Sequence, residues 1–351
     1  MIQKLRSIFK SLIDLVLAKK LISVVLVLLI FFFTFFIIFL SKIGPVDKND
    51  KEPVFIEISS GQSFVSVLDM LESNNLIKSK FYAKILLKFK NKNLKAGYYR
   101  FTRSMSVSEI FDLLTEGKEF FIPVSIPEGS TVFDITSILE KKGFDRVFIE
   151  DFNKSLNDKT LIEKYSIPFD NLEGYIFPST YYLPKNFDGK KFAEIALKTF
   201  RFKTKDLFSN IDKNTEKRVM IIGSIIEKEA RLDTEKPIIA SVFYNRLEKN
   251  MPLESCATVI YTFERIGIHK VRLLYKDLSI DSPYNTYRNR GLPPAPISNP
   301  GLESIKAALY PLKTDYLYFV YKGNKEHYFS RTLKEHMDAY KKYILYQKVN
   351  R

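Results

Sequence analysis

The longest hydrophobic run in the chain lies near its start. Residues 21–40 contain only two polar side chains, Ser23 and Thr34. A helix of about 20 such residues spans the hydrocarbon core of a bilayer. A signal peptide is the alternative, but its apolar region is usually shorter, and no small-residue cleavage site follows Leu40. We therefore expect a retained transmembrane helix over residues 21–40.

The charges on either side of this run predict its orientation. The residues before it carry five basic side chains against Asp14, whereas the signs are mixed after it. The positive-inside rule then places residues 1–20 in the cytoplasm and the rest of the chain outside. The expected location is a single-pass protein of a bacterial plasma membrane. Residues 41–53 follow as a short polar linker.

Shorter patterns predict a small module over residues 54–121. The order is a strand at 54–58, helices at 65–71 and 81–89, a strand at 94–101, and a helix at 106–116 that ends at Gly117. The strand–helix–helix–strand part resembles the LysM-type module, which binds glycans that contain N-acetylglucosamine. The alternative is a structural spacer between the membrane and a catalytic domain.

Residues 122–347 read as a second, larger domain. Helical spacing predicts helices over 220–230 and 236–247 and a short helix within 253–263. Residues 171–184 and the proline-rich residues 281–300 read as loops, and a long rigid loop is usually functional. Residues 316–321 and 327–330 predict a hairpin. The predicted class is α+β, with small sheets and helices around a cleft.

One carboxylate in the helix at 220–230 stands out. The apolar residues form a stripe, and Glu227 falls off it, one turn after the small residues Gly223 and Ser224. We interpret Glu227 as facing an open cleft, and Glu229 as lying nearer the edge of the core. The alternative is a solvated surface glutamate, which is the common case for this residue on a helix.

Composition narrows the possible partners. The net charge of +15 and the sequence pI of about 9.4 favour an anionic partner, and a nucleic-acid-binding protein is one hypothesis. However, the lysines are spread along the chain, and the expected location is outside the membrane, so we predict no nucleic-acid partner. One cysteine and three scattered histidines provide no set of metal ligands, so we predict no metal site.

Several motifs, taken together, resemble the YceG-like family of endolytic murein transglycosylases, known as MltG. They are E-G-Y-I-F-P-S-T-Y at 173–181, I-I-E-K-E-A at 225–230, A-S-V-F-Y-N-R-L at 240–247, T-V-I-Y at 258–261, S-P-Y-N-T-Y at 282–287, G-L-P-P-A-P-I-S-N-P-G at 291–301, Y-L-Y-F-V at 316–320 and H-Y-F-S at 327–330. They occur in the family's order. Individually they are weak signals, but their combination is specific.

The resemblance implies a membrane-anchored enzyme that cuts peptidoglycan glycan strands internally, without a cofactor. The bond between N-acetylmuramic acid and N-acetylglucosamine is broken when the muramic acid's own primary hydroxyl closes onto its anomeric carbon, which leaves an anhydro end. The resemblance makes Glu227 the catalytic acid and base, for which partial burial should raise the pKa. It also suggests penicillin-binding proteins or other wall synthases as partners.

Further residues are candidates for binding the glycan. They are Glu173, Asn245, Tyr261, Tyr284, Asn285 and Thr286, each of which could instead hold a loop in place. The chain departs from the family pattern at Ser179, Cys256, Ala257 and Ala295. We interpret Cys256 as a packing residue. Because two acidic positions are lost, the second hypothesis is a non-catalytic scaffold that binds peptidoglycan within the wall synthesis machinery.

Overall fold

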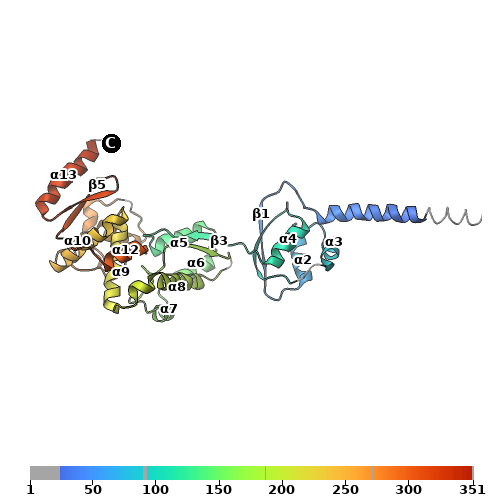
Figure 1. Cartoon of the computed structure of the whole chain (residues 1–351), viewed down its shortest axis with the longest axis horizontal. Coiled ribbons are helices and arrows are strands. Elements are labelled where there is room, and N and C mark those ends of the chain that lie inside the picture. Colours follow the sequence, from blue (N-terminus) through green and yellow to red (C-terminus); the bar gives the residue numbers. More distant parts are fainter. Residues whose placement is uncertain (1–23, 90–92, 186, 271, 350–351) are drawn as a thin grey trace, which may run out of the picture. The chain divides into compact units, whose positions relative to one another are not determined.

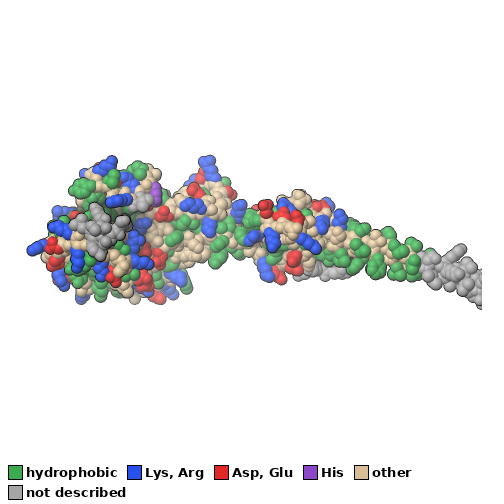
Figure 2. All heavy atoms as spheres, turned by 90° about the horizontal axis from the view of Figure 1, so that it is seen from above, with side chains coloured by type: hydrophobic (Ala, Val, Ile, Leu, Met, Phe, Trp, Pro, Cys, Tyr) green, Lys and Arg blue, Asp and Glu red, His purple; other side chains and the backbone are tan. Residues whose placement is uncertain are grey.

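The computed structural model describes residues 24–89, 93–185, 187–270 and 272–349. The predicted cytoplasmic segment 1–20 and the first residues of the predicted span, 21–23, lie outside the described residues. The helix Val24–Ile43 has a mean hydropathy of 3.1 and none of it is buried, so its length and composition allow it to cross a membrane. Figure 2 shows an exposed surface of hydrophobic side chains along it.

The chain divides into two compact units, Met1–Phe121 and Ile122–Arg351. Beyond the apolar helix, the first unit contains β1 (Pro53–Ile58), α2 (Phe64–Ser73), α3 (Lys80–Leu86), the 3-10 turn η1 (Leu87–Phe89), β2 (Gly97–Thr102) and α4 (Val107–Glu116). β1 and β2 pair antiparallel, from Pro53 opposite Thr102 to Ile58 opposite Gly97. Their inward side chains and the helices form one hydrophobic core. The predicted order of strands and helices is thus confirmed, whereas a LysM-type function stays a prediction.

The second unit is mostly helical (Figure 1). Its elements are β3 (Ile122–Ser125), α5 (Val132–Lys141), α6 (Arg146–Ser155), α7 (Lys159–Lys164), β4 (Thr180–Leu183), α8 (Gly189–Phe208), α9 (Lys213–Glu229), η2 (Asp233–Glu235), α10 (Lys236–Glu248), α11 (Cys256–Arg265), η3 (Tyr275–Ser279), α12 (Leu302–Leu309), β5 (Tyr318–Gly323), β6 (Glu326–Ser330) and α13 (Leu333–Val349). The α+β class is confirmed.

The strands of the second unit form two separate antiparallel pairs. β5 and β6 are the predicted hairpin, and its turn contains Asn324 and Lys325, both with positive φ. β3 pairs with β4, which lies at the end of a segment that the sequence predicts as a loop. That prediction is wrong for Thr180–Leu183, where Tyr181 and Leu183 are buried and the residues between them point outward, as a strand's period of two requires.

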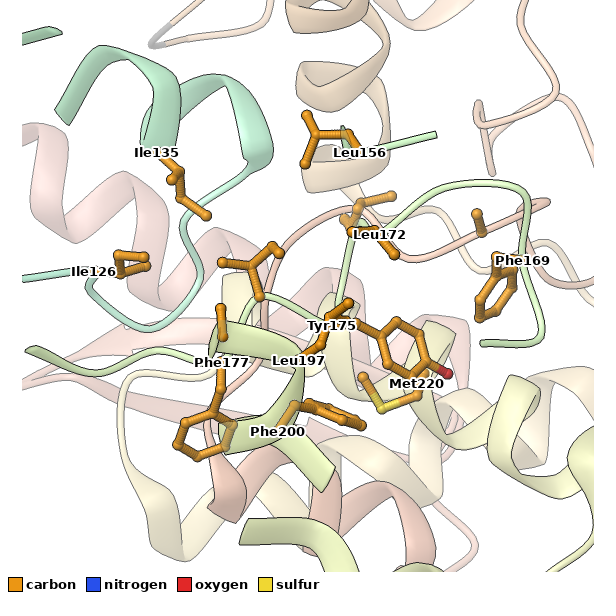
Figure 3. Packing of buried hydrophobic residues seen from close by; sticks show 14 of the residues in the cluster. Ile126, Ile135, Leu156, Phe169, Leu172, Tyr175, Phe177, Leu197, Phe200 and Met220 are labelled. Atoms are coloured by element: carbon orange, nitrogen blue, oxygen red, sulfur yellow. The ribbon is translucent and has the colours of Figure 1, made fainter. Parts of the chain in front are cut away.

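Helix α9 runs through the core of the second unit. The side chain of Asp212 caps its first turn by accepting from the N–H groups of Asn214 and Thr215. All residues from Val219 to Ile226 are buried, which means that the helix has no solvent face there. Figure 3 shows Met220 among the aromatic and aliphatic side chains of this core, beside Tyr175. Polar side chains of α9 can therefore reach the surface only in its first turns, before Val219, and in its last turn, after Ile226.

Candidate active site

The last turn of α9 carries the two carboxylates of the E-K-E motif, and the structure directs them to different surroundings. Glu227 Oε2 accepts hydrogen bonds from the Gly301 N–H (2.9 Å) and the Ser304 hydroxyl (2.6 Å), both at the start of α12. The ammonium of Lys236, which is 4% exposed, lies 3.6 Å from the same oxygen. Glu227 therefore connects α9 to α12 and to a buried cation.

Gly223 and Ser224 do not leave open space above Glu227, so that part of the sequence interpretation is wrong. Both are buried, and a methyl group on Gly223 would touch the backbone of Ser304 and Ile305. The Ser224 hydroxyl donates to the Ile221 carbonyl and accepts from the Ile297 N–H. Small residues are needed here because α12 and the proline-rich loop pack directly against α9.

Glu229 is the carboxylate that reaches open space, which reverses the expected orientation of the pair. It is partly buried, and its Oε1 accepts a 2.5 Å hydrogen bond from the Ser255 hydroxyl. Burial raises the pKa of the Glu229 carboxyl, and the bond from Ser255 opposes that shift. A half-buried carboxyl with a raised pKa has the properties of a general acid.

Two cavities meet at this residue. The smaller, of about 490 Å³, lies between the end of α9, α10, the start of α11, β5 and α13. The larger, of about 630 Å³, is lined mainly by charged and polar side chains, including Lys228, Arg231 and Lys325. Glu229, Tyr321 and His327 line both cavities. Glu227 lines neither of them.

The remaining predicted site residues divide into two groups, of which the first surrounds Glu173. This carboxyl is 2% exposed and accepts from the Val132 N–H, the Tyr261 hydroxyl and the Asn299 amide. Burial raises its pKa to about 8. The structure thus brings Glu173 and Tyr261 together, and Tyr284 packs edge-on against the Tyr261 ring. This group joins α5, α11 and the two loops and lines neither cavity.

The second group holds loop backbones. The Asn245 amide donates to the carbonyls of Thr314 and Tyr316, and the Asn285 amide donates to those of Leu278 and Ile280. These bonds fix the segments after α12 and around η3. Both residues thus have the loop-holding contacts that were the alternative to glycan binding.

Thr286 supports the cavity indirectly. Its hydroxyl accepts from the Ser255 N–H at 3.0 Å and lies 2.9 Å from the Thr258 hydroxyl. Ser255 in turn binds Glu229. The Y-N-T loop therefore positions the residue that positions Glu229, and the next residue in the chain, Tyr287, lines the smaller cavity.

Comparison with known proteins decides the family. Residues 56–342 match the sequence profile of the YceG-like family. The chain belongs to the YceG-like family.

Curated relatives and a crystal structure agree with this assignment. An endolytic murein transglycosylase of Bacillus subtilis (strain 168) is 38% identical over 87% of this chain and 88% of its own length. One from Streptococcus pneumoniae serotype 2 is 31% identical over 86% of this chain and 61% of its own length. The crystal structure of a YceG-like protein from Listeria monocytogenes, 36% identical, covers 82% of this chain and 99% of its own with a TM-score of 0.57. The protein is thus an enzyme of the lytic transglycosylase class, a lyase.

Two of the departures from the YceG-like pattern, Cys256 and Ala257, directly follow Ser255 at the start of α11. Cys256 is exposed and lines the smaller cavity, with its Sγ 3.1 Å from the Tyr287 hydroxyl, so its interpretation as a packing residue is wrong. Ala257 and Ala295 are buried. Cys256 begins α11 directly after Ser255, and its side chain lines the same cavity as Glu229. In the described part of the chain, no group of three or more His, Cys, Asp or Glu side chains is placed to hold a metal ion.

Sequence reasoning did not identify Glu229 and His327 as residues that line both cavities. His327 was noted only as a hairpin residue, although it begins the H-Y-F-S motif. Its Nδ1 lies 2.8 Å from Glu235 Oε2, and the two side chains are almost fully buried. A histidine at the start of a family motif was the available signal, but its carboxylate partner is 92 residues away in the chain.

Proposed function

We propose that this enzyme is anchored in the plasma membrane and cuts murein glycan strands internally between N-acetylmuramic acid and N-acetylglucosamine, leaving anhydro ends. The names of the curated relatives support the substrate. The apolar helix Val24–Ile43 supports the anchor. The charge distribution ahead of it supports an orientation in which residues 41–351 lie outside the membrane, facing the wall and its synthases.

The proposed general acid is Glu229 in place of Glu227, and one observation carries this choice. Glu229 lines both cavities and burial raises its pKa, whereas Glu227 is bound by two donors and a buried ammonium. An acid that starts the reaction must hold a proton near neutral pH and must reach the substrate. Glu229 combines a pKa that burial raises with a place in the walls of both cavities.

One carboxyl can suffice for this reaction. Ordinary glycosidases need a second carboxylate to act as nucleophile or to activate water. Here the nucleophile is a hydroxyl of the substrate itself, so its effective concentration at the anomeric carbon is already high. Glu229 donates its proton to the leaving oxygen as the glycosidic bond breaks and the new intramolecular bond forms. The proton of the attacking hydroxyl needs an acceptor, which is either the ionised Glu229 or a neighbouring base.

The test is mass spectrometry of long glycan strands after incubation with the full chain in detergent. The compared proteins are the wild type, Glu229→Gln, Glu227→Gln and a matched control, Glu248→Gln, at an exposed position of α10. We expect anhydro ends from the wild type and the control and none from Glu229→Gln. Glu227→Gln should melt at a lower temperature but still cut, because its bonds to α12 are structural.

Three results would contradict the proposal. A folded but inactive Glu227→Gln beside an active Glu229→Gln would return the catalytic role to the residue predicted from the sequence. Reducing ends in place of anhydro ends would show hydrolysis by water. Binding of strands without cutting by the wild type would mean that the activity itself is absent.

A further inference from the structure

One histidine of the second unit is fixed in the wall of the candidate active site. His327 lies in β6, and its backbone N–H donates to Glu235 Oε1 at 2.9 Å while its Nδ1 lies 2.8 Å from Glu235 Oε2. The backbone contact fixes the Glu235 carboxylate, and the contact to Nδ1 then fixes the orientation of the ring. Because an ionised carboxylate only accepts, Nδ1 carries the proton, and in the neutral ring Nε2 has the free lone pair.

The other ring nitrogen faces open space. Within the described residues no group hydrogen-bonds to His327 Nε2, yet this atom is not among the buried polar atoms that lack a partner. Phe319 and Tyr321 pack edge-on to the ring at 5.5 and 5.8 Å between centroids. Phe319, Tyr321 and Glu235 thus fix the ring. Nε2 is the ring nitrogen that can contact a ligand in the cavities that His327 and Glu229 line.

We propose that His327 is the second proton-transfer residue of this site and accepts the proton of the attacking muramic acid hydroxyl at Nε2. The proposal rests on the proposed function. As the bond from the hydroxyl oxygen to the anomeric carbon forms, that proton moves to His327. As the glycosidic bond breaks, the leaving oxygen takes the proton of Glu229. The imidazolium then returns its proton to the Glu229 carboxylate, so that both residues are restored and no proton is gained or lost.

A separate base removes a geometric conflict. If Glu229 acted alone, one carboxyl would have to reach the leaving oxygen and the attacking hydroxyl in turn. With an acid on α9 and a base on β6, both protons can move while the sugar stays in one position. Glu229 and His327 line the same two cavities, so the final proton return takes place within the site.

Other titratable and charged side chains line the same cavities and will influence the pH dependence. They are Lys228 and Glu229 on α9, Arg231 after it, Arg246 on α10, Glu254, Cys256 and Tyr287 around the start of α11, Tyr321 and Lys325 in the hairpin, and His336 and Tyr340 on α13. Glu235 is the group in direct contact with His327.

The test is the pH dependence of kcat/KM for anhydro-end formation by the full chain in detergent. In the wild type the rate should rise with pH as the imidazole loses its proton and fall as Glu229 loses its own. His327→Gln should lower kcat/KM by about 100-fold or more and abolish the rising limb, since general base catalysis contributes roughly that factor. His269→Gln, the same change at a histidine outside both cavities, is the matched control and should keep both limbs.

A second variant covers the case in which His327→Gln fails to fold. In Glu235→Gln a neutral amide replaces the carboxylate that stabilises the imidazolium, so the ring should lose its proton at lower pH and the rising limb should move down. A reduced rate with an unchanged profile in both variants would mean that His327 is only structural and would overturn the proposal. If the wild type forms no anhydro ends, the proposed function itself fails, and this inference fails with it.

Discussion

The hydrogen bond from Ser255 to Glu229 provides a quantitative test of which carboxyl is the acid. Its hydroxyl lies 2.5 Å from Glu229 Oε1, and this bond lowers a pKa that burial raises. A hydrogen bond to a charged group contributes about 1.5–3 kcal/mol. Since one pH unit corresponds to about 1.4 kcal/mol, Ser255→Ala should raise the pKa of Glu229 by about 1–2 units.

The direction in which Ser255→Ala moves the pH–rate profile follows from the role of Glu229 as an acid. An acid must be protonated to act, so a higher pKa moves the falling limb of the pH–rate profile to higher pH by the same amount. The assay is the rate of anhydro-end formation across pH in the full chain. Ser304→Ala is the matched control, because it removes the 2.6 Å bond to Glu227 and should leave the limb in place. A shift in Ser304→Ala and none in Ser255→Ala would refute the assignment of Glu229.

Two further predictions concern residues that the sequence linked to the site. Gly223→Ala should keep full activity and raise the melting temperature by about 2–4 °C, because a helical Ala is favoured over Gly by about 1 kcal/mol and the added methyl makes ordinary contacts of 3.5–3.6 Å with α12. Loss of activity would instead mean that the sugar passes over Gly223. The pKa of Glu173 is raised from 4.5 to about 8, so the native state holds this proton more tightly and the stability of the wild type should fall as pH rises between those values. Glu173→Gln should remove this part of the pH dependence in thermal melts, and parallel curves for the two proteins would show that Glu173 is ionised in the fold.

Some of the site could be predicted from the sequence because its signals are local. The hairpin at 318–330 follows from alternating aromatic residues around a turn, and the absence of regular elements from Asp281 to Pro300 follows from its prolines. The position of α9 follows from helical spacing. These features depend on residues that are close together in the chain, so the sequence alone is enough to predict them.

The orientation of the two carboxylates could not be predicted in the same way. The helical-face argument assumed one buried stripe, whereas α9 is buried on every side from Val219 to Ile226. Which of the two carboxyls reaches a cavity depends on the residues that pack beyond the end of α9. These residues are Gly301, Ser255 and His327. These residues are 26 to 98 positions away from Glu229, and only the tertiary fold brings them to it.

Cys256 offers a test of how the cavity tolerates the loss of an acidic residue. The resemblance to the YceG-like family implies Asp at this position, and here the thiol lies 3.1 Å from the Tyr287 hydroxyl, in the cavity that Glu229 lines. In Cys256→Asp, a second negative charge near Glu229 should disfavour its ionised form and move the falling limb of the pH–rate profile to higher pH. Cys256→Asn, of equal size and neutral, separates the charge from the change in shape. If the falling limb lies at the same pH in both variants as in the wild type, the side chain at position 256 does not influence the pKa of Glu229. A carboxylate at this position in relatives would then serve to bind the glycan or to stabilise the fold. If the falling limb moves only in the Asp variant, Glu229 has a lower pKa beside the thiol than beside an Asp carboxylate. This enzyme would then work at lower pH than a relative with Asp at this position.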